Sequence, residues 1–125
     1  MASLIRRLPD AELEVMLAVW AHPAPVSRTQ IEHSLQRQEP MALTTLLTLL
    51  TRLAEKGFLA VEKIGRSNCY TPLISHQEYL AAQSNRFIRQ LCGGNLSTFA
   101  AALCDSGLSK EELAQLRDLL ERDAL

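Results

Sequence analysis

The chain of 125 residues has the length of one domain, or of a small domain with a dimerising extension. Its 47% hydrophobic and 22% charged residues are ordinary for a folded soluble protein, and its net charge of −1 argues against a broadly basic protein that coats nucleic acid. No apolar run reaches the roughly 18 residues needed to cross a bilayer. Charged residues also interrupt the stretch that a signal peptide would need, so we expect a cytoplasmic protein.

A first helix is predicted to start at Asp10, which can act as its cap, while Glu12 and Glu14 complement the positive end of the helix dipole. The prolines of residues 22–25 end it. We interpret Trp20 as a core anchor, because it completes an apolar stripe. The stripe comprises Leu13, Met16, Leu17 and Trp20.

A second helix is predicted to open with a capping box between Ser27 and Gln30. It turns Ile31 and Leu35 inward and ends around residues 38–40, where Pro40 enforces a turn. Two short helices joined by a tight turn form the helix-turn-helix pattern. In that motif the first helix crosses the DNA backbone, which would place Arg28 and Thr29 near phosphates.

The helix that follows is the centre of the chain. One side is an apolar stripe of Leu46, Leu49, Leu50 and Leu53. The other side carries Thr44, Thr48 and Thr51 with Arg52 beside them, and Thr45 and Leu47 lie on the flanks. Threonine is a poor helix former, and short hydroxyl side chains can reach phosphates or base edges of a duplex. The alternative is a buried leucine-rich helix whose threonines only face solvent or pack on a neighbour.

The next segment favours the DNA-binding interpretation. Gly57 closes the central helix, and two short strands are predicted at 58–61 and 69–73 around a tip at 65–68 flanked by Lys63. A helix followed directly by a basic hairpin is typical of a winged helix-turn-helix. At the tip, Arg66 is either a solvated turn charge or a contact to the sugar-phosphate backbone.

The charge distribution agrees with this arrangement, because residues 40–73 carry a net charge of +2 and residues 74–125 a net charge of −2. Cys69, Cys92 and Cys104 lack the close-spaced pairs of a structural zinc site, so we expect reduced, mostly buried thiols and no metal or cofactor.

Three apolar helices are predicted after the wing. Ser75 caps one that runs to about Cys92 and is ended by a Gly-Gly pair, residues 95–103 form a second, and a capping box at Ser109 opens the last. The winged domain leaves them too little surface to pack on. A second copy of the same segment would cover them and give a twofold-symmetric dimer.

The chain resembles the penicillinase-repressor (BlaI/MecI) family of bacterial transcription repressors over nearly its whole length. The resemblance rests on LPDAELEVMLAVW, TLLTLLTRLAEKGFL and CGGN followed by LSKEELAQLRDLLE. It implies a mainly α fold with a β-hairpin wing, divided into a winged helix-turn-helix DNA-binding domain at 1–74 and a helical dimerisation domain at 75–125. It also implies a homodimer that represses genes from a dyad-symmetric operator, without a cofactor.

Carried onto this sequence, the resemblance makes 42–56 the recognition helix. The implied DNA-binding residues are Arg28, Thr29, Ala42, Thr44, Thr45, Thr48, Arg52, Lys63, Arg66 and Ser67. The implied dimerisation residues are Leu80, Phe87, Ile88, Leu91, Phe99, Leu103, Leu113, Leu116 and Leu120.

The chain departs from the family in three places. Met41, Ala42, Thr44 and Leu47 replace a Trp-Ser-like pair and basic residues early in the recognition helix. Ala101-Ala102 stands where repressors of β-lactam resistance are cleaved at an Asn-Phe bond, so the sequence leaves the inducing signal open between a protease and a small molecule. The C-terminus lacks the cysteine pairs of the copper-responsive branch.

A winged-helix adaptor that binds protein with little DNA affinity is the alternative from another class, since the recognition helix lacks early basic residues. An enzyme is not expected. The sequence has no Gly-rich phosphate loop, no metal-ligand cluster and no nucleophile beside a patterned His and acid.

Overall fold

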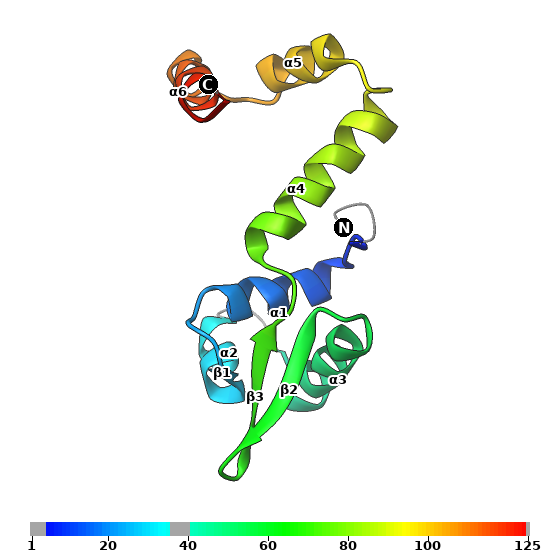
Figure 1. Ribbon diagram of the computed structural model, residues 1–125, viewed down its shortest axis with the longest axis vertical. Helices are drawn as coiled ribbons and strands as arrows, with labels where there is room; N and C mark the ends of the chain where they lie inside the picture. Colours follow the sequence, from blue (N-terminus) through cyan, green and yellow to red (C-terminus); the bar gives the residue numbers. More distant parts are fainter. Residues whose placement is uncertain (1–4, 36–40, 125) are drawn as a thin grey trace. The chain divides into compact units, whose positions relative to one another are not determined.

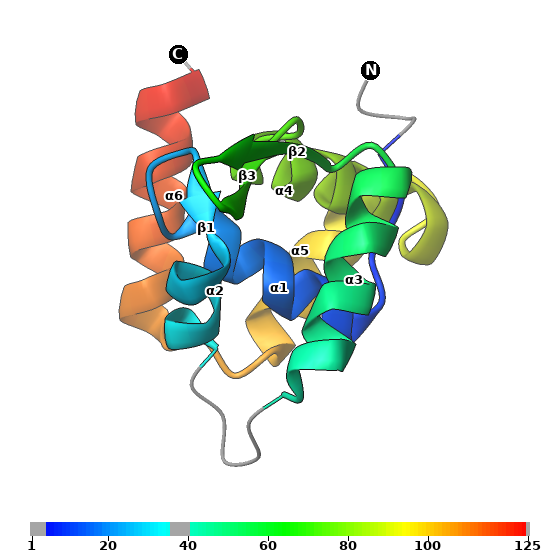
Figure 2. The same ribbon diagram turned by 90° about the horizontal axis from the view of Figure 1, so that it is seen from below.

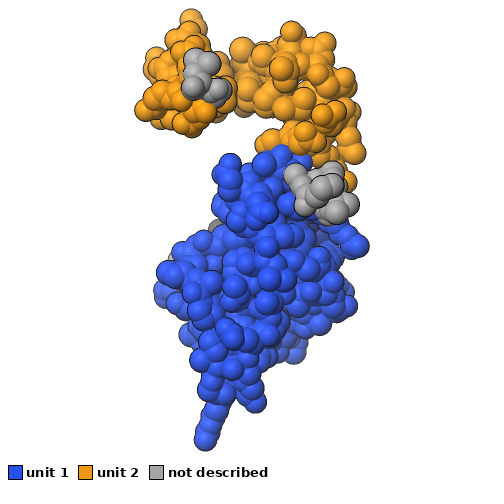
Figure 3. Space-filling view, viewed as in Figure 1, with its two compact units in different colours: residues 1–83 blue, residues 84–125 orange. Residues whose placement is uncertain are grey.

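The computed structural model of the chain describes residues 5–35 and 41–124. It divides into two compact units, residues 1–83 and 84–125 (Figure 3). The predicted class, mainly α with a small β wing, is confirmed. None of the helices in the described ranges is long and apolar enough to cross a membrane. In chain order the elements are α1 (Asp10–Trp20), β1 (Val26–Ser27), α2 (Arg28–Ser34), α3 (Leu43–Glu55), β2 (Leu59–Ile64), β3 (Ser67–Pro72), α4 (His76–Arg86), the π-helical turn η2 (Phe87–Leu91), α5 (Leu96–Asp105) and α6 (Lys110–Ala124).

In the first unit, α1 lies between α2 and α3 (Figure 2). The strands form an antiparallel sheet in the order β1-β3-β2, and the β2–β3 hairpin extends beyond the three helices (Figure 1). The sequence pattern indicated only the two hairpin strands. It missed β1 because a strand of two residues, Val26 and Ser27, is too short to show a period and exists only through its pairing with Tyr70 and Cys69.

The hydrophobic core of this unit is built from all three helices and the sheet. The apolar stripe predicted for α3 is confirmed, since all four of its leucines are buried. The largest fully buried side chains are Phe58, Met16, Ile31, Leu46, Leu50, Leu53, Val15, Val19 and Val26.

Two expectations about α1 were wrong. Leu17 is exposed whereas Val15 and Val19 are fully buried, because α1 is apolar nearly all round and its sequence pattern could not fix the inward side. The N-cap residue is Pro9, and Asp10 is instead the first helical residue with no capping hydrogen bond. Glu12 lies in the first turn of α1, as predicted, and its side chain is in addition buried.

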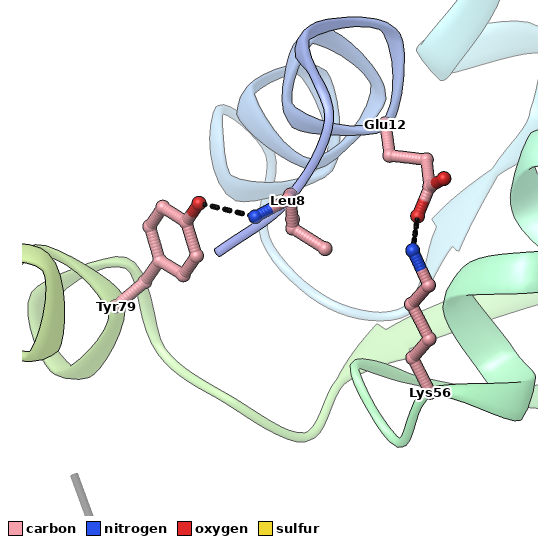
Figure 4. Close-up of polar contacts among 4 residues, drawn as sticks. All are labelled: Leu8, Glu12, Lys56 and Tyr79. Carbon is pink, nitrogen blue, oxygen red and sulfur yellow. Dashed lines mark hydrogen bonds and ion pairs between the residues drawn. The ribbon is translucent and has the colours of Figure 1, made fainter. Parts of the chain in front are cut away.

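Glu12 is buried because it pairs with Lys56, which follows α3 (Figure 4). The Lys56 Nζ donates to Glu12 Oε1 at 2.5 Å. Elsewhere in the same unit, the backbone N–H of Leu8 donates to the Tyr79 hydroxyl at 2.9 Å. The ion pair therefore fixes the end of α3 to α1, and the Tyr79 bond fixes the start of α4 to the segment that precedes α1.

Trp20 is partly buried against the core, as predicted. Its Nε1 donates to the Ile74 carbonyl oxygen at 3.0 Å, and its ring stacks on His76 with centroids 4.6 Å apart. Its ring also contacts Tyr79. These contacts hold the segment that leaves the wing against the end of α1.

Helix and turn boundaries agree with the predictions where local signals set them. The central helix, Leu43–Glu55, is within one residue of the predicted 42–56 at each end, and Gly57 follows with a φ of +84°. The second helix is shorter than predicted, because α2 ends at Ser34; the predicted end and the Pro40 turn lie outside the described residues. The hairpin turn is only two residues long, and Gly65 takes a φ of +64° there.

The helix predicted to run from Ser75 to about Cys92 is confirmed: it begins at His76, after a capping box between Ser75 and Glu78, and continues without a break to Leu91. The α-helical part ends at Arg86, and η2 carries the chain to Leu91 before two glycines of positive φ. The short apolar helix is observed as α5, which begins after Asn95 and ends at Asp105. The capping box predicted at the start of α6 is present, between Ser109 and Glu112.

Apolar side chains in this second unit are largely uncovered. Phe87 and Phe99 contact each other edge to face, with centroids 5.6 Å apart. Cys92 is nonetheless the one buried residue among those whose side chains the structure describes from 84 to 123. Cys69 in the first unit is also buried, and Cys104 is exposed; all three are free thiols.

Candidate nucleic-acid interface

Every residue that the sequence predicted to contact DNA is exposed. Nine of the ten line one of two hollows, both of which involve α3. The tenth, Ala42, is the N-cap residue of α3 and lines neither. The fold thus brings predicted contact residues from segments far apart in the sequence to the same two hollows.

The larger hollow, which we call the wing groove, has a volume of about 410 Å³. It collects the predicted residues from α2 and from the hairpin, and its lining side chains include three basic ones and no acidic one among the residues described there. It is lined by Ser27, Arg28, Thr29, Leu47, Lys63, Arg66, Ser67, Asn68 and Tyr70.

The α2 side of the wing groove is positioned by the capping box that the sequence predicted. The Gln30 N–H donates to Ser27 Oγ at 3.2 Å, and the Ser27 N–H donates to Gln30 Oε1 at 3.0 Å. This fixes the first turn of α2, from which Arg28 and Thr29 project. Arg28 also pairs with Glu32 one turn later at 3.0 Å, an exposed pair of small energetic value that leaves the guanidinium accessible.

The hairpin side of the groove follows from strand register. Lys63 lies opposite Asn68 and Ile64 lies opposite Ser67, so the two-residue turn places Arg66 at the tip. Burial raises the pKa of the Tyr70 phenol above its usual value of 10.0, although a hydrogen bond with Asn68 and the Arg28 charge oppose that rise. Tyr70 is therefore neutral at physiological pH and does not offset the positive charge of the groove.

The smaller hollow, which we call the threonine face, has a volume of about 300 Å³ and is formed by α3 alone. Two threonines of α3 use their hydroxyl hydrogens within the helix. Thr48 Oγ1 donates to the Thr44 carbonyl oxygen and Thr51 Oγ1 donates to the Leu47 carbonyl oxygen, both at 2.9 Å. The threonine face is lined by Thr44, Thr45, Thr48, Leu49 and Arg52.

Sequence reasoning did not select four residues of the wing groove: Ser27, Leu47, Asn68 and Tyr70. Asn68 could have been found, because it is the cross-strand partner of Lys63 and shares its side of the hairpin. Conversely, Lys56 was counted in the basic charge of the winged part, but its charge is neutralised by Glu12. In the part of the chain that the structure describes, no group of three or more His, Cys, Asp or Glu could hold a metal ion.

Three helices with a basic β-hairpin directly after the third define a winged helix-turn-helix protein. The sequence profile of the Penicillinase repressor family matches residues 8–122. The chain belongs to this family, which is one of transcriptional repressors and not of enzymes.

Individual relatives agree with this assignment. The chain is 32% identical to the penicillinase repressor of Bacillus licheniformis, over 94% of this chain and 91% of that protein. It is 28% identical to the methicillin resistance regulatory protein MecI of Staphylococcus aureus, over 92% of this chain and 94% of that protein. The solution structure of monomeric Bacillus licheniformis BlaI in complex with the blaP half-operator matches with a TM-score of 0.50 and 36% identity, covering 60% of this chain and 90% of that one.

Proposed function

We propose that this protein is a sequence-specific DNA-binding transcriptional repressor that acts in the cytoplasm as a homodimer on a dyad-symmetric operator and is released by an inducing signal. The observation that carries the proposal is the wing groove, which joins basic and hydroxyl side chains of α2 and the hairpin beside the exposed side of α3. The BlaI structure supports it, because that relative is bound to a half-operator.

In this arrangement α3 enters the major groove, and Thr44, Thr45 and Thr48 reach base edges. Arg52 clamps a phosphate beside them. Five residues of the wing groove position the protein on the sugar-phosphate backbone. Arg28 and Thr29 do so from α2, and Lys63, Arg66 and Ser67 do so from the hairpin. Ala42, exposed at the first turn of α3, lies close enough to its N-terminus to approach the same DNA surface.

The second unit, together with Leu80 of α4, supplies the proposed dimer interface. Apart from the buried Cys92, the apolar side chains described in the second unit are exposed or only partly buried, and large exposed apolar surface commonly marks a protein–protein interaction site. A second copy covers it symmetrically. The proposed functional boundary at 74/75 separates DNA binding from dimerisation, although Tyr79 and Ala82 of α4 are buried within the first compact unit. The proposed interface residues are Leu80, Phe87, Ile88, Leu91, Phe99, Leu103, Leu113, Leu116 and Leu120.

The decisive test is fluorescence-anisotropy binding to the duplex upstream of the protein's own gene, at two salt concentrations with competitor duplex present. A repressor binds tightly, resists competitor and weakens with salt, because each neutralised phosphate releases counterions. A folded dimer that shows no binding at low salt contradicts the proposal and favours the protein-binding adaptor.

Two classes of variant distinguish side chains that contact the phosphate backbone from side chains that read base edges. Arg66→Ala should weaken binding to all sequences alike and lower the salt slope by about 0.9, the contribution of one phosphate contact. Thr45→Ala and Thr48→Ala should also relax sequence preference. Arg117→Ala is the matched control, because it removes an exposed arginine from α6. Equal losses of specific and non-specific binding in all three test variants would contradict the base-reading role of the threonines.

The dimer is tested separately by truncation after Gln83, the last residue of the first compact unit, so that His76 and Tyr79 keep their contacts with Trp20. The shortened chain should sediment as a monomer and bind a half-site weakly. A monomer contacts one half-site only, so it loses the gain in affinity that a dimer has from binding both half-sites at once. A truncated chain that remains dimeric would place the interface within the winged domain instead.

A further inference from the structure

Leu47 lies where DNA-binding side chains are expected, yet it is apolar. Leu47 sits at mid-helix in α3, is 39% exposed, and lines the wing groove with Lys63 and Arg66. A single exposed leucine on a protein surface needs no explanation in itself. The position of Leu47 does need an explanation. Thr44 and Thr48 lie beside it on the same exposed side of the helix, whereas the core leucines lie on the opposite side.

The neighbouring threonines add to the apolar character of this surface. Because Thr48 and Thr51 donate their hydroxyl hydrogens to backbone carbonyls of α3, their oxygen atoms are left to accept hydrogen bonds and not to donate them. Each also carries a methyl group. The exposed side of α3 around Leu47 therefore offers methyl groups and hydrogen-bond acceptors.

Guanine is most often read by a different set of groups. Its O6 and N7 are both acceptors, and their commonest specific partners are the paired donors of arginine or lysine. Between Leu43 and Thr51 the helix has no arginine, lysine, asparagine or glutamine, and its first basic residue is Arg52, near its C-terminal end. Recognition helices contact base edges chiefly with their N-terminal part.

An A·T pair matches what α3 offers. In the major groove thymine presents a methyl group, which binds apolar side chains, and adenine presents an N6 amino group, which needs an acceptor. We propose that α3 reads A·T pairs, and that Leu47 is the specificity-determining residue because it contacts a thymine methyl group. This inference rests on the proposed function, since it requires α3 to lie in the major groove.

The test uses the full-length chain and a duplex selected by it from a random-sequence library. Each thymine of the selected site is replaced in turn by uracil, which removes one methyl group and keeps base pairing. Affinity for each duplex is measured by fluorescence anisotropy for the wild-type chain and for Leu47→Ala. Leu43→Ala is the matched control: Leu43 is 45% exposed on the same helix, but it lines a separate hollow with Glu32 and Leu35.

At one or two thymines per half-site, uracil should weaken wild-type binding about fourfold, the value expected for one buried carbon group. Leu47→Ala should bind the thymine duplex more weakly and lose this sensitivity, while Leu43→Ala keeps it. Uracil effects that are absent, or that are the same in wild type and Leu47→Ala, overturn the proposal. Failure of the library to yield any competitor-resistant duplex instead contradicts DNA binding itself, so the two failures are distinguishable.

Discussion

Replacing Lys56 by methionine should destabilise the winged unit strongly, because it leaves the Glu12 carboxylate buried without its partner. The Glu12 side chain is 5% exposed and that of Lys56 is 24% exposed. Removing one member of a buried pair typically costs 3–5 kcal/mol, and the partial exposure of this pair favours a cost of about 3 kcal/mol.

The converse substitution, Glu12→Gln, should cost much less. Glutamine keeps an oxygen that accepts from the Lys56 ammonium, and the partly exposed ammonium retains access to water. We expect a cost of about 1 kcal/mol, similar to that of one ordinary hydrogen bond. The burial of the two side chains thus predicts an asymmetry of about 2 kcal/mol between the variants.

Urea unfolding followed by the fluorescence of Trp20 measures both costs. Trp20 is the single tryptophan of the chain and packs on Ile74, His76 and Tyr79 within the first unit, so its signal reports on that unit. Protomer concentration must be held fixed, because the proposed dimerisation would make apparent stability depend on it. Equal midpoints for the two variants, or a greater loss for Glu12→Gln, would refute the argument from burial.

Three further expectations concern caps and turns. Ser27→Ala should cost about 1 kcal/mol of stability in urea unfolding, because it removes the capping box of α2. It should also weaken DNA binding, because the capping box orients the first turn of α2. A loss of stability with unchanged affinity would show that α2 does not contact DNA. Gly65→Ala should cost about 1 kcal/mol and reduce affinity, since the residue has a φ of +64° at the wing tip, and an unaltered hairpin by NMR would contradict this. The pKa of Glu78 lies below its usual value. The largest cause is the hydrogen bond from the backbone N–H of Ser75, and the second is a hydrogen bond with the Ser75 side chain. The stability contributed by this cap is therefore present above the ordinary glutamate pKa and is lost as pH falls through the lower folded value; Ser75→Ala should raise the pKa of Glu78 in an NMR titration, and an unchanged value would show that the hydroxyl has no part in it.

Much of the fold was predictable because its signals are local. The capping boxes at Ser27 and Ser109 join residues three positions apart, so they form wherever the helix starts. Gly57 and Gly65 mark backbone conformations that few other residues adopt, and they set the end of α3 and the hairpin turn. The leucine stripe of α3 was also readable, because polar residues occupy the opposite side.

The sequence by itself thus determined the order of helices, the wing and the exposure of the predicted contact residues. Only the tertiary structure decided which side of α1 faces inward, since its apolar residues lie nearly all round, and that Val26 and Ser27 form a strand. It also decided that Glu12 pairs with Lys56, 44 residues away. The wing groove also depends on the tertiary structure, since it is formed by the first turn of α2 and a hairpin more than thirty residues later in the chain. Such contacts depend on how separate elements pack together, and no pattern within a short stretch of sequence records that packing.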